Sequence, residues 1–189
     1  MIFTKGTVEK YTFRFQSEDI IEVDKYKVCL DGGYAVFMLD TQHFILSVES
    51  DWGAFTYRWC VSERETFKAL MLRIGGYYLC DKISNRSEID WKKTKKNARQ
   101  DFFRYGKCKD KEKIKEFLNE IDSVDENEVR FYDFVTSYAP DLWEGGFFVK
   151  DYPVKAKIIV EIFERYLKGE LRKENEAVDN TRTATEKKQ

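Results

Sequence analysis

Apolar and polar residues alternate along the first sixty residues, and this period of two restricts the fold more than any other feature of the sequence. In residues 10–15, aromatic side chains occupy every second position and polar side chains the positions between them, which is typical of a half-buried strand. Asp31-Gly32-Gly33 predicts a hairpin turn, because glycine accepts positive φ at no steric cost. Short alternating segments joined by tight turns predict an antiparallel β-meander of about five strands over residues 1–61.

The apolar spacing changes to a helical period after residue 61. Ser62-Glu63-Arg64-Glu65 matches the S-x-x-E capping box, in which serine and glutamate satisfy free backbone amides reciprocally. Further helix starts are expected at Ser87, Asp110, the Asp125 and Glu128 pair, and Pro153. We therefore expect an α+β protein of a single domain, with the helical region 62–171 packed on the sheet. Apolar residues end at Leu171, so residues 172–189 are expected to form a disordered polar tail.

Charged residues make up 35% of the chain, but the basic and acidic ones nearly cancel, to a net charge of −1. This balance predicts no attraction of the whole molecule to nucleic acid or to a membrane. Residues 1–13 include charged residues, whereas the core of a signal peptide is apolar. No apolar run approaches the roughly 20 residues of a membrane span. The sequence therefore predicts a soluble, cytoplasmic protein without a membrane partner.

Neither a metal site nor a cofactor site is expected. The four cysteines form no C-x-x-C pair and His43 is the only histidine, whereas zinc sites of this type need closely spaced ligand pairs. The glycine pairs also lack the spacing of a phosphate-binding loop.

Two patterns offer weak catalytic signals. Asp90-Trp91-Lys92 has the D-x-K spacing of metal-dependent nuclease cores, with Asp81 upstream, but those cores place the motif on a strand and a helix is expected here. Cys29 and His43 could act as nucleophile and base only if the fold brought them together. Cys29 lies in an alternating strand, which favours an inert thiol. We therefore expect a protein that is not an enzyme.

The segment 50–59 (SDWGAFTYRW) contains four aromatic residues in ten positions. The last three rings share one face of the expected strand, and burying each would contribute roughly 1.5–3 kcal/mol, so we expect them in the core. Trp52 differs, because it stands at a turn beside Asp51. Asp51 and Trp52 are therefore candidate partner-binding residues, and packing of the Trp52 ring in the core is the alternative.

A basic run lies at residues 91–99. Its basic residues are Lys92, Lys93, Lys95, Lys96 and Arg99. On a helix, most of them would line one side, where like charges repel and nucleic-acid phosphates would offset the repulsion. They are candidate nucleic-acid-binding residues, and the alternative is a solvated helix face that pairs with nearby carboxylates.

Carboxylates far outnumber bases from residue 112 to residue 144. The candidate partner-binding residues in this segment are Glu120, Asp122, Asp125 and Glu126. A ridge of this kind could imitate a phosphate backbone and occupy the nucleic-acid channel of a nuclease. The alternative is an ordinary acidic helix surface.

Three segments carry a family resemblance. Residues 50–59 match the pattern SDWG-x-[FY]-x-[YH]-x-W, and FKALML at 67–72 and YYLCDKIS at 77–84 resemble the two segments that follow it. In these segments the chain resembles a family of small proteins encoded by bacteriophages and prophages. The resemblance implies a phage accessory protein, similar in style to anti-defence proteins such as anti-CRISPR inhibitors, and it brings no catalytic residue.

The leading hypothesis is a phage-encoded, non-enzymatic binding protein that inhibits a host nucleic-acid-targeting defence complex by occupying a protein surface. Its partner would be a host defence protein or a ribonucleoprotein complex. The alternative is a nucleic-acid-binding accessory protein that uses the basic helix 91–99. A homodimer is compatible with both.

Overall fold

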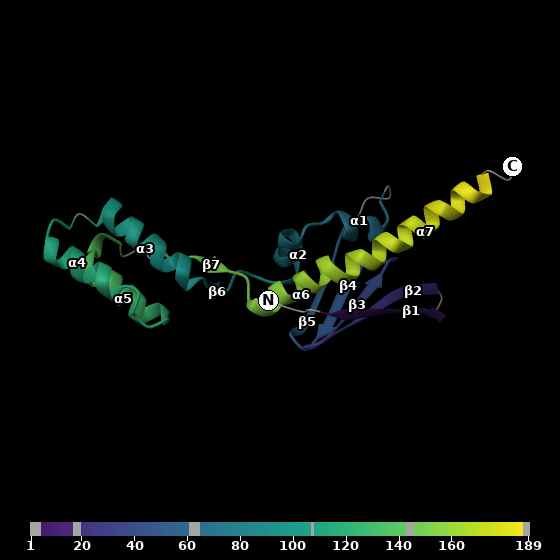
Figure 1. Cartoon of the computed structure of the whole chain (residues 1–189), viewed down its shortest axis with the longest axis horizontal. Helices are drawn as coiled ribbons and strands as arrows, with labels where there is room; N and C mark the ends of the chain where they lie inside the picture. The colour runs from purple at the N-terminus through teal and green to yellow at the C-terminus, as the bar shows by residue number, and fades with distance from the viewer. Residues whose placement is uncertain (1–4, 17–19, 61–64, 107, 143–145, 187–189) are drawn as a thin grey trace. The chain divides into compact units, whose positions relative to one another are not determined.

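The computed structural model describes residues 5–16, 20–60, 65–106, 108–142 and 146–186 (Figure 1). The chain divides into two compact units. Unit 1 comprises Met1–Asn85 and Tyr152–Gln189, and unit 2 comprises Arg86–Asp151. In sequence, unit 2 is therefore an insertion between the two parts of unit 1.

Unit 1 contains the predicted antiparallel meander. Its five strands lie in the order β1-β2-β3-β4-β5, so each strand pairs with its neighbours in sequence. The strands are β1 (Gly6–Gln16), β2 (Ile20–Leu30), β3 (Gly33–Asp40), β4 (Ile45–Ser50) and β5 (Gly53–Arg58). The α+β fold class and the five-stranded sheet expected from the alternating pattern are confirmed.

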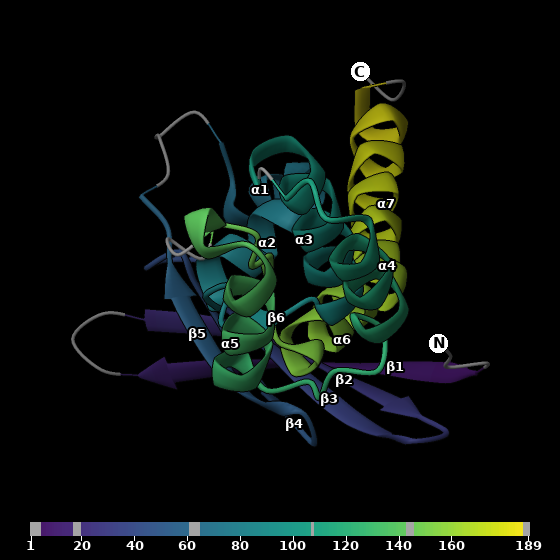
Figure 2. The same ribbon diagram turned by 90° about the vertical axis from the view of Figure 1, so that its left-hand side faces the viewer.

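The helices of unit 1 lie on one side of this sheet (Figures 1 and 2). They are α1 (Phe67–Arg73), α2 (Gly76–Ile83), α6 (Val154–Ile162), a π-helical turn (Phe163–Leu167) and α7 (Lys168–Glu186). The sheet face beneath them carries Tyr26, Phe37 and Val48, which stand opposite one another across β2, β3 and β4 and are fully or almost fully buried. Burial of this row against the helices forms the core of unit 1.

The aromatic rings at the end of the meander lie where the sequence predicted them. Trp59 is 6% exposed, and its ring centroid lies 4.6 Å from that of Tyr57 and 5.8 Å from that of Phe67 at the start of α1. Phe55 is half-buried against the same core. The three rings of β5 and its end therefore anchor the first helix on the sheet.

Strand β1 is not half-buried as predicted, because Val8 is its only partly buried residue between positions 6 and 14 and the others are exposed. Tyr11 stands opposite Lys25 and Phe13 opposite Val23 on the face away from the helices, where the two rings are 47% and 43% exposed. Lys10 stands opposite the buried Tyr26 and therefore faces the helices. The alternation of β1 fixes two faces but does not specify which of them the helices cover.

Helix α1 begins later than the capping box indicated. Its N-cap is Thr66, whose hydroxyl accepts a hydrogen bond of 3.2 Å from the Ala69 amide. Residues 62–64 of the predicted capping box lie outside the described residues. The cap is still a hydroxyl side chain, which satisfies one of the free amides of the first turn.

The segment expected to be a disordered tail continues α7 as far as Glu186. Leu171 is 1% exposed, and one turn later Glu174 forms ion pairs with Lys10 and Lys68. These contacts tie the start of the segment 172–189 to the sheet, and composition alone does not reveal them. Residues 187–189 lie outside the described residues.

Unit 2 is built from three helices and a short two-stranded ribbon within its described residues. These elements are β6 (Glu88–Ile89), α3 (Trp91–Tyr105), α4 (Lys111–Glu120), α5 (Glu128–Tyr138), a 3₁₀ turn (Pro140–Leu142) and β7 (Lys150–Asp151). Strands β6 and β7 are antiparallel partners, so the two ends of the unit lie side by side. The core is rich in phenylalanine: Phe102, Phe117, Phe131 and Phe147 are each at most 2% exposed.

The caps in unit 2 follow the predictions only in part. Asp110 caps α4 as expected, with its carboxylate accepting from the amides of Glu112 and Lys113. The predicted start at Ser87 is wrong, since β6 follows that residue and Asp90 caps α3. The predicted cap at Asp125 is also wrong, because Asn127 accepts from the Arg130 amide at 3.1 Å.

The helices of the expected region 62–171 fall into both units. Helices α3, α4 and α5 pack on one another around the phenylalanine cluster, whereas α1, α2, α6 and α7 belong to the unit that contains the sheet. Apolar residues at a helical period predict each helix well. They do not predict which other helix or sheet the apolar side of that helix packs against.

Candidate functional site

The turn that carries Trp52 joins β4 to β5 and is fixed by hydrogen bonds. The Ser50 hydroxyl donates to the Gly53 carbonyl at 2.7 Å, and the Asp51 carboxylate accepts from the Tyr34 amide at 2.9 Å. Trp52 is half-buried and packs against the core of unit 1, and a Cβ on Gly33 would lie 3.0 Å from its ring. The structure therefore gives Trp52 a packing role, and its proposed role in partner binding would fall to the exposed part of the ring.

Helix α3 carries the basic run, but its cations fall into two groups. Lys95 donates to the backbone carbonyls of Asp122 and Val124, at 2.9 and 3.0 Å, and so satisfies carbonyls of the turn that follows α4. Arg99 forms an ion pair of 2.5 Å with Asp122. Lys92, Lys93 and Lys96 are exposed, with Lys93 paired to Asp90 at 2.9 Å. The basic run is therefore a partly paired helix face, in which Lys92 and Lys96 are exposed and form no ion pair with any described residue.

The predicted acidic residues lie on α4 and on the turn that follows it. Asp122 pairs with Arg99, and Asp125 pairs with Arg130. Glu126 is exposed and forms no ion pair with any described residue. Glu120 is also exposed, and its carboxylate accepts a long 3.5 Å hydrogen bond from the Tyr138 hydroxyl. Two of the four predicted carboxylates are therefore neutralised within unit 2, and two remain available.

Charge in unit 2 is divided along the chain. Residues 86–115 contain twelve basic and five acidic residues, whereas residues 116–144 contain nine acidic residues and one basic residue. The Lys95 and Arg99 contacts join these segments at the α4–α5 turn. The basic segment therefore covers α3 and the first half of α4, and the acidic segment covers the end of α4, the α4–α5 turn and α5.

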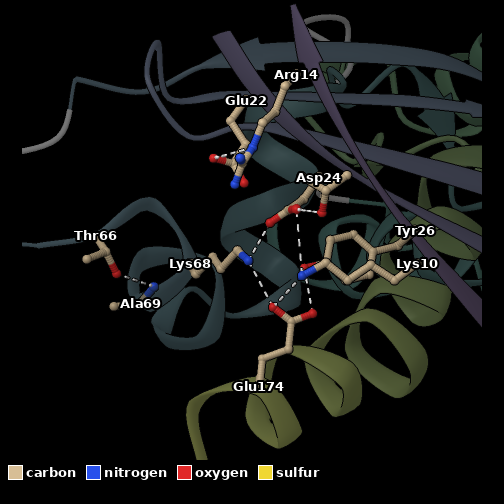
Figure 3. A network of polar contacts seen from close by, with 10 residues as sticks. Lys10, Arg14, Glu22, Asp24, Tyr26, Thr66, Lys68, Ala69 and Glu174 are labelled. Atoms are coloured by element: carbon tan, nitrogen blue, oxygen red, sulfur yellow. Dashed lines mark hydrogen bonds and ion pairs between the residues drawn. The ribbon is translucent and has the colours of Figure 1, made fainter. Parts of the chain in front are cut away.

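Unit 1 contains a charged cluster that sequence patterns did not indicate (Figure 3). The Glu174 carboxylate of α7 lies 2.9 Å from the Lys10 ammonium and 2.8 Å from the Lys68 ammonium. Lys68 also pairs with Asp24 of β2, which is only 6% exposed. The Tyr26 hydroxyl donates to Glu174 at 2.9 Å. This cluster joins two strands and two helices between the layers of unit 1.

Protonation in the cluster follows from these contacts. Burial raises the pKa of the Asp24 carboxyl, but hydrogen bonds from Lys68 and Thr12 outweigh burial, so that the pKa lies below its usual value. For Glu174, burial is likewise outweighed by hydrogen bonds from Lys68 and Lys10, and its pKa is also lowered. Burial would lower the pKa of Lys68, but its bonds to the two carboxylates raise it instead.

The same contacts argue against acid–base chemistry in this cluster. Burial raises the pKa of Tyr26, so its phenol stays protonated and donates to Glu174. A raised pKa also keeps Lys68 protonated, whereas a lysine nucleophile must be neutral. The cluster is therefore a set of mutually compensated charges that positions α1 and α7 on the sheet.

The two weak catalytic patterns are not assembled in the described residues. Cys29 stands opposite Tyr34 near the start of β3, whereas His43 follows the end of β3 and its Nδ1 lies 2.8 Å from Asp40. The ends of this strand are about 20 Å apart, so the thiol and the imidazole do not form a dyad. Asp90 caps α3 through a 3.0 Å hydrogen bond from the Lys93 amide. A strand-borne D-x-K motif is therefore not formed there.

Within the described ranges, no group of three or more His, Cys, Asp and Glu side chains is placed to hold a metal ion. None of the helices in that part of the chain is long and apolar enough to cross a membrane.

Comparison with known proteins identifies a phage family. Residues 9–173 match the family Phage_phiTE_072, described as a phage family. Because this match spans most of the chain, the protein belongs to that phage family. No curated protein and no solved structure gives a significant match. The prediction of a phage protein is therefore confirmed at the level of the family.

Proposed function

We propose that this phage protein is a non-enzymatic accessory protein that binds and inhibits a host nucleic-acid-targeting defence complex, in the manner of anti-CRISPR inhibitors. It would act in the host cytoplasm, on a defence protein or a ribonucleoprotein complex. The contact surface would be the acidic α4–α5 region of unit 2. A homodimer remains compatible with this role, because the proposed surface needs only one copy of the chain.

The exposed carboxylates of unit 2 support this proposal. Glu120 and Glu126 remain available although Asp122 and Asp125 are paired internally. Lys95 hydrogen-bonds to two carbonyls of the turn between α4 and α5, so the free carboxylates project from an ordered element. Fixed negative charge of this kind complements a basic nucleic-acid channel, because such a channel is lined with cations that bind phosphates.

The proposal is tested by measuring how strongly the protein inhibits a reconstituted defence nuclease. The double variant Glu120→Gln and Glu126→Gln removes two exposed charges without breaking an ion pair, and we expect inhibition to weaken by about fivefold or more. Glu176→Gln, which removes an exposed carboxylate from α7 in unit 1, is the matched control and is expected to inhibit as the wild type does. If the wild-type chain leaves defence activity intact and recovers no defence component from host lysate, the proposal is wrong.

The non-enzymatic part of the proposal has a separate test. An inhibitor that occupies a surface acts stoichiometrically, so inhibition should reach its maximum at a fixed molar ratio of inhibitor to complex. An enzyme that modifies the complex would inhibit at far smaller amounts and would leave the complex inactive after its removal. Titration of inhibitor against complex, followed by separation of the two, distinguishes these outcomes.

The alternative function is nucleic-acid binding by α3. The exposure of Lys92 and Lys96, one turn apart on the helix, favours it. Replacing Lys92, Lys93 and Lys96 by glutamine would then weaken salt-dependent binding of DNA or RNA in a gel-shift assay. Unchanged binding after this replacement would exclude α3 as the nucleic-acid site.

The Trp52 turn is a second contact proposed for the partner. Trp52→Phe keeps an aromatic ring on Gly33 while it removes the indole nitrogen, and Asp51→Asn keeps the side-chain oxygen that accepts from Tyr34. A loss of inhibition in these variants with unchanged folding would assign the turn to the interface.

A further inference from the structure

The sheet of unit 1 has a second face, opposite its helices. Two of the most exposed rings of unit 1 lie on it, Tyr11 and Phe13 of β1. The register places Lys25 of β2 directly opposite Tyr11 and Lys27 two residues further along the same face. Met38 of β3 continues the row that begins with Tyr11 and Lys25. This face, which we call the open face, therefore presents rings at its edge with cations beside them.

The two rings have the spacing of a stacking surface. Tyr11 and Phe13 are next-but-one neighbours on a strand, so their side chains rise from the same face about 7 Å apart. This separation is about twice the 3.4 Å rise of stacked bases in a duplex strand. Two neighbouring bases that stack on the two rings therefore cannot stack on each other. Only a single strand allows neighbouring bases to move apart in this way.

The cations of the open face are available, whereas most of its carboxylates are engaged. In the described part of the chain, Lys25, Lys27 and Arg58 form no ion pair, and Lys25 lies 5.8 Å from the centre of the Phe13 ring. By contrast, Glu9 accepts a 2.9 Å hydrogen bond from the Tyr11 hydroxyl.

The Asp40 carboxylate is held by the His43 amide at 2.9 Å and by the His43 ring at 2.8 Å. Glu49 is the remaining carboxylate on the described rows of the open face. These hydrogen bonds leave the carboxylates charged, so the described rows of the open face carry three cations and three carboxylates in all. Beside the rings, on β1 and β2, Lys25 and Lys27 face Glu9 alone, so the charge next to the rings is positive and complements phosphate.

We propose that the open face of the sheet binds single-stranded nucleic acid, with bases stacked on Tyr11 and Phe13 and phosphates near Lys25 and Lys27. Aromatic rings on an antiparallel sheet flanked by basic residues are a general solution for unpaired bases, since every base has a flat face to stack. In a duplex, neighbouring bases cover the flat faces of each base. A five-stranded sheet is also too broad to enter either groove of the duplex. The site lies on unit 1 and is independent of the acidic surface in the proposed function.

Fluorescence anisotropy with labelled oligonucleotides of about 10–15 residues tests the proposal, since single-strand sites span roughly 4–16 nucleotides. Oligo-dT, oligo-U and a duplex of equal length distinguish DNA from RNA and single strands from double strands. We expect the single strands to bind and the duplex to bind at least about tenfold more weakly.

Tyr11→Ala and Phe13→Ala are each expected to weaken single-strand binding by about fivefold or more. The matched control is Phe103→Ala, which removes a ring that is 61% exposed in unit 2 and should leave the affinity unchanged. Circular dichroism and gel filtration confirm that each variant keeps the wild-type fold and oligomeric state.

Lys25→Gln with Lys27→Gln should reduce the dependence of binding on salt, because fewer counterions are released. The matched charge control is Lys113→Gln with Lys115→Gln, two exposed lysines of α4, and Lys92→Gln with Lys96→Gln tests the alternative site on α3. Absence of single-strand binding by the wild type at low salt overturns the proposal. So does binding that survives the ring variants, or that is lost only with the α3 pair.

Discussion

The two units place their charges in opposite ways. In unit 1, Asp24, Lys68 and Glu174 meet between the sheet and its helices, and each is balanced by the others. In unit 2, the buried cluster consists of apolar residues, and the charges lie outside it on α3, α4 and α5. Charge inside unit 1 positions structural elements, whereas charge on unit 2 is available to a partner. This difference directs the search for a protein-binding surface to unit 2.

The largest expected effect tests whether unit 2 depends on its own core. Phe117 is fully buried and stacks on Phe102 with ring centroids 4.1 Å apart. Phe117→Ala should destabilise unit 2 by about 3–5 kcal/mol, because it leaves a cavity in a small core. Hydrogen exchange should then show lost protection in α3, α4 and α5 with protection kept in β2 and β3.

The matched control for that prediction is Phe103→Ala, which changes an exposed neighbour on the same helix and should cost less than about 1 kcal/mol. Equal loss of protection in both units after Phe117→Ala would show that they unfold together. The description of unit 1 and unit 2 as having separately stabilised cores would then be wrong.

The next effect tests the interior charges of unit 1. Lys68→Met leaves the nearly buried Asp24 without its closest cation and should cost about 2–3 kcal/mol, because an uncompensated charge remains inside. Adding Asp24→Asn should restore part of the lost stability, since the buried charge is then gone. Urea unfolding followed through hydrogen exchange of β2 measures both variants. A double variant no more stable than Lys68→Met alone would contradict the assigned pairing.

The same cluster predicts a dependence on pH. The pKa values of Asp24 and Glu174 are lowered in the folded chain, so their contribution is complete above the unfolded pKa of about 4 and is lost as the pH falls below it. Unit 1 should therefore lose on the order of 1 kcal/mol more than an Asp24→Asn and Glu174→Gln variant between about pH 5 and pH 3. Parallel stability curves for the two proteins would contradict this prediction.

Some acid sensitivity should persist in that double variant. Asp40 keeps a pKa lowered by its hydrogen bonds from His43, which outweigh burial, and Glu65 keeps one lowered by Arg73. The difference between the two curves, and not the slope of either curve, therefore reports the cluster.

The smallest expected effect concerns the surface pairs of unit 2. Arg99→Gln breaks the ion pair with the exposed Asp122 and should change stability by no more than about 0.5 kcal/mol. It also frees a carboxylate, so inhibition of a defence complex should be kept or strengthened. Thermal melting and the interference assay measure the two results. A large loss of stability would place Arg99 among the structural charges, as in unit 1.

The sequence predicted the sheet well because its signals are local. Alternation and the glycine turns fixed five antiparallel strands, and the rings of residues 55, 57 and 59 pack in the core as expected. Asp110 was found as a cap because a cap and its amides are close in the chain. A phage protein was expected from short segments of the chain, and the family match supports that expectation at the level of the family.

Features that depend on distant residues were not predictable in the same way. Asp24, Lys68 and Glu174 are separated by long stretches of chain, and nothing in their spacing predicts a shared cluster. Of the helical segment past Leu171, Glu174 belongs to that cluster. The basic and acidic segments were each recognised, but their partial neutralisation through Lys95, Arg99 and Asp122 follows from helix packing, which composition does not encode.

The pairing of β6 with β7 has a consequence for how such proteins diversify. Glu88 stands opposite Asp151 and Ile89 opposite Lys150, so the chain leaves and re-enters at adjacent points. A segment bounded in this manner can be lengthened, shortened or exchanged while the order of the five strands stays the same. Members of the phage family can thus vary this module and retain the same supporting scaffold.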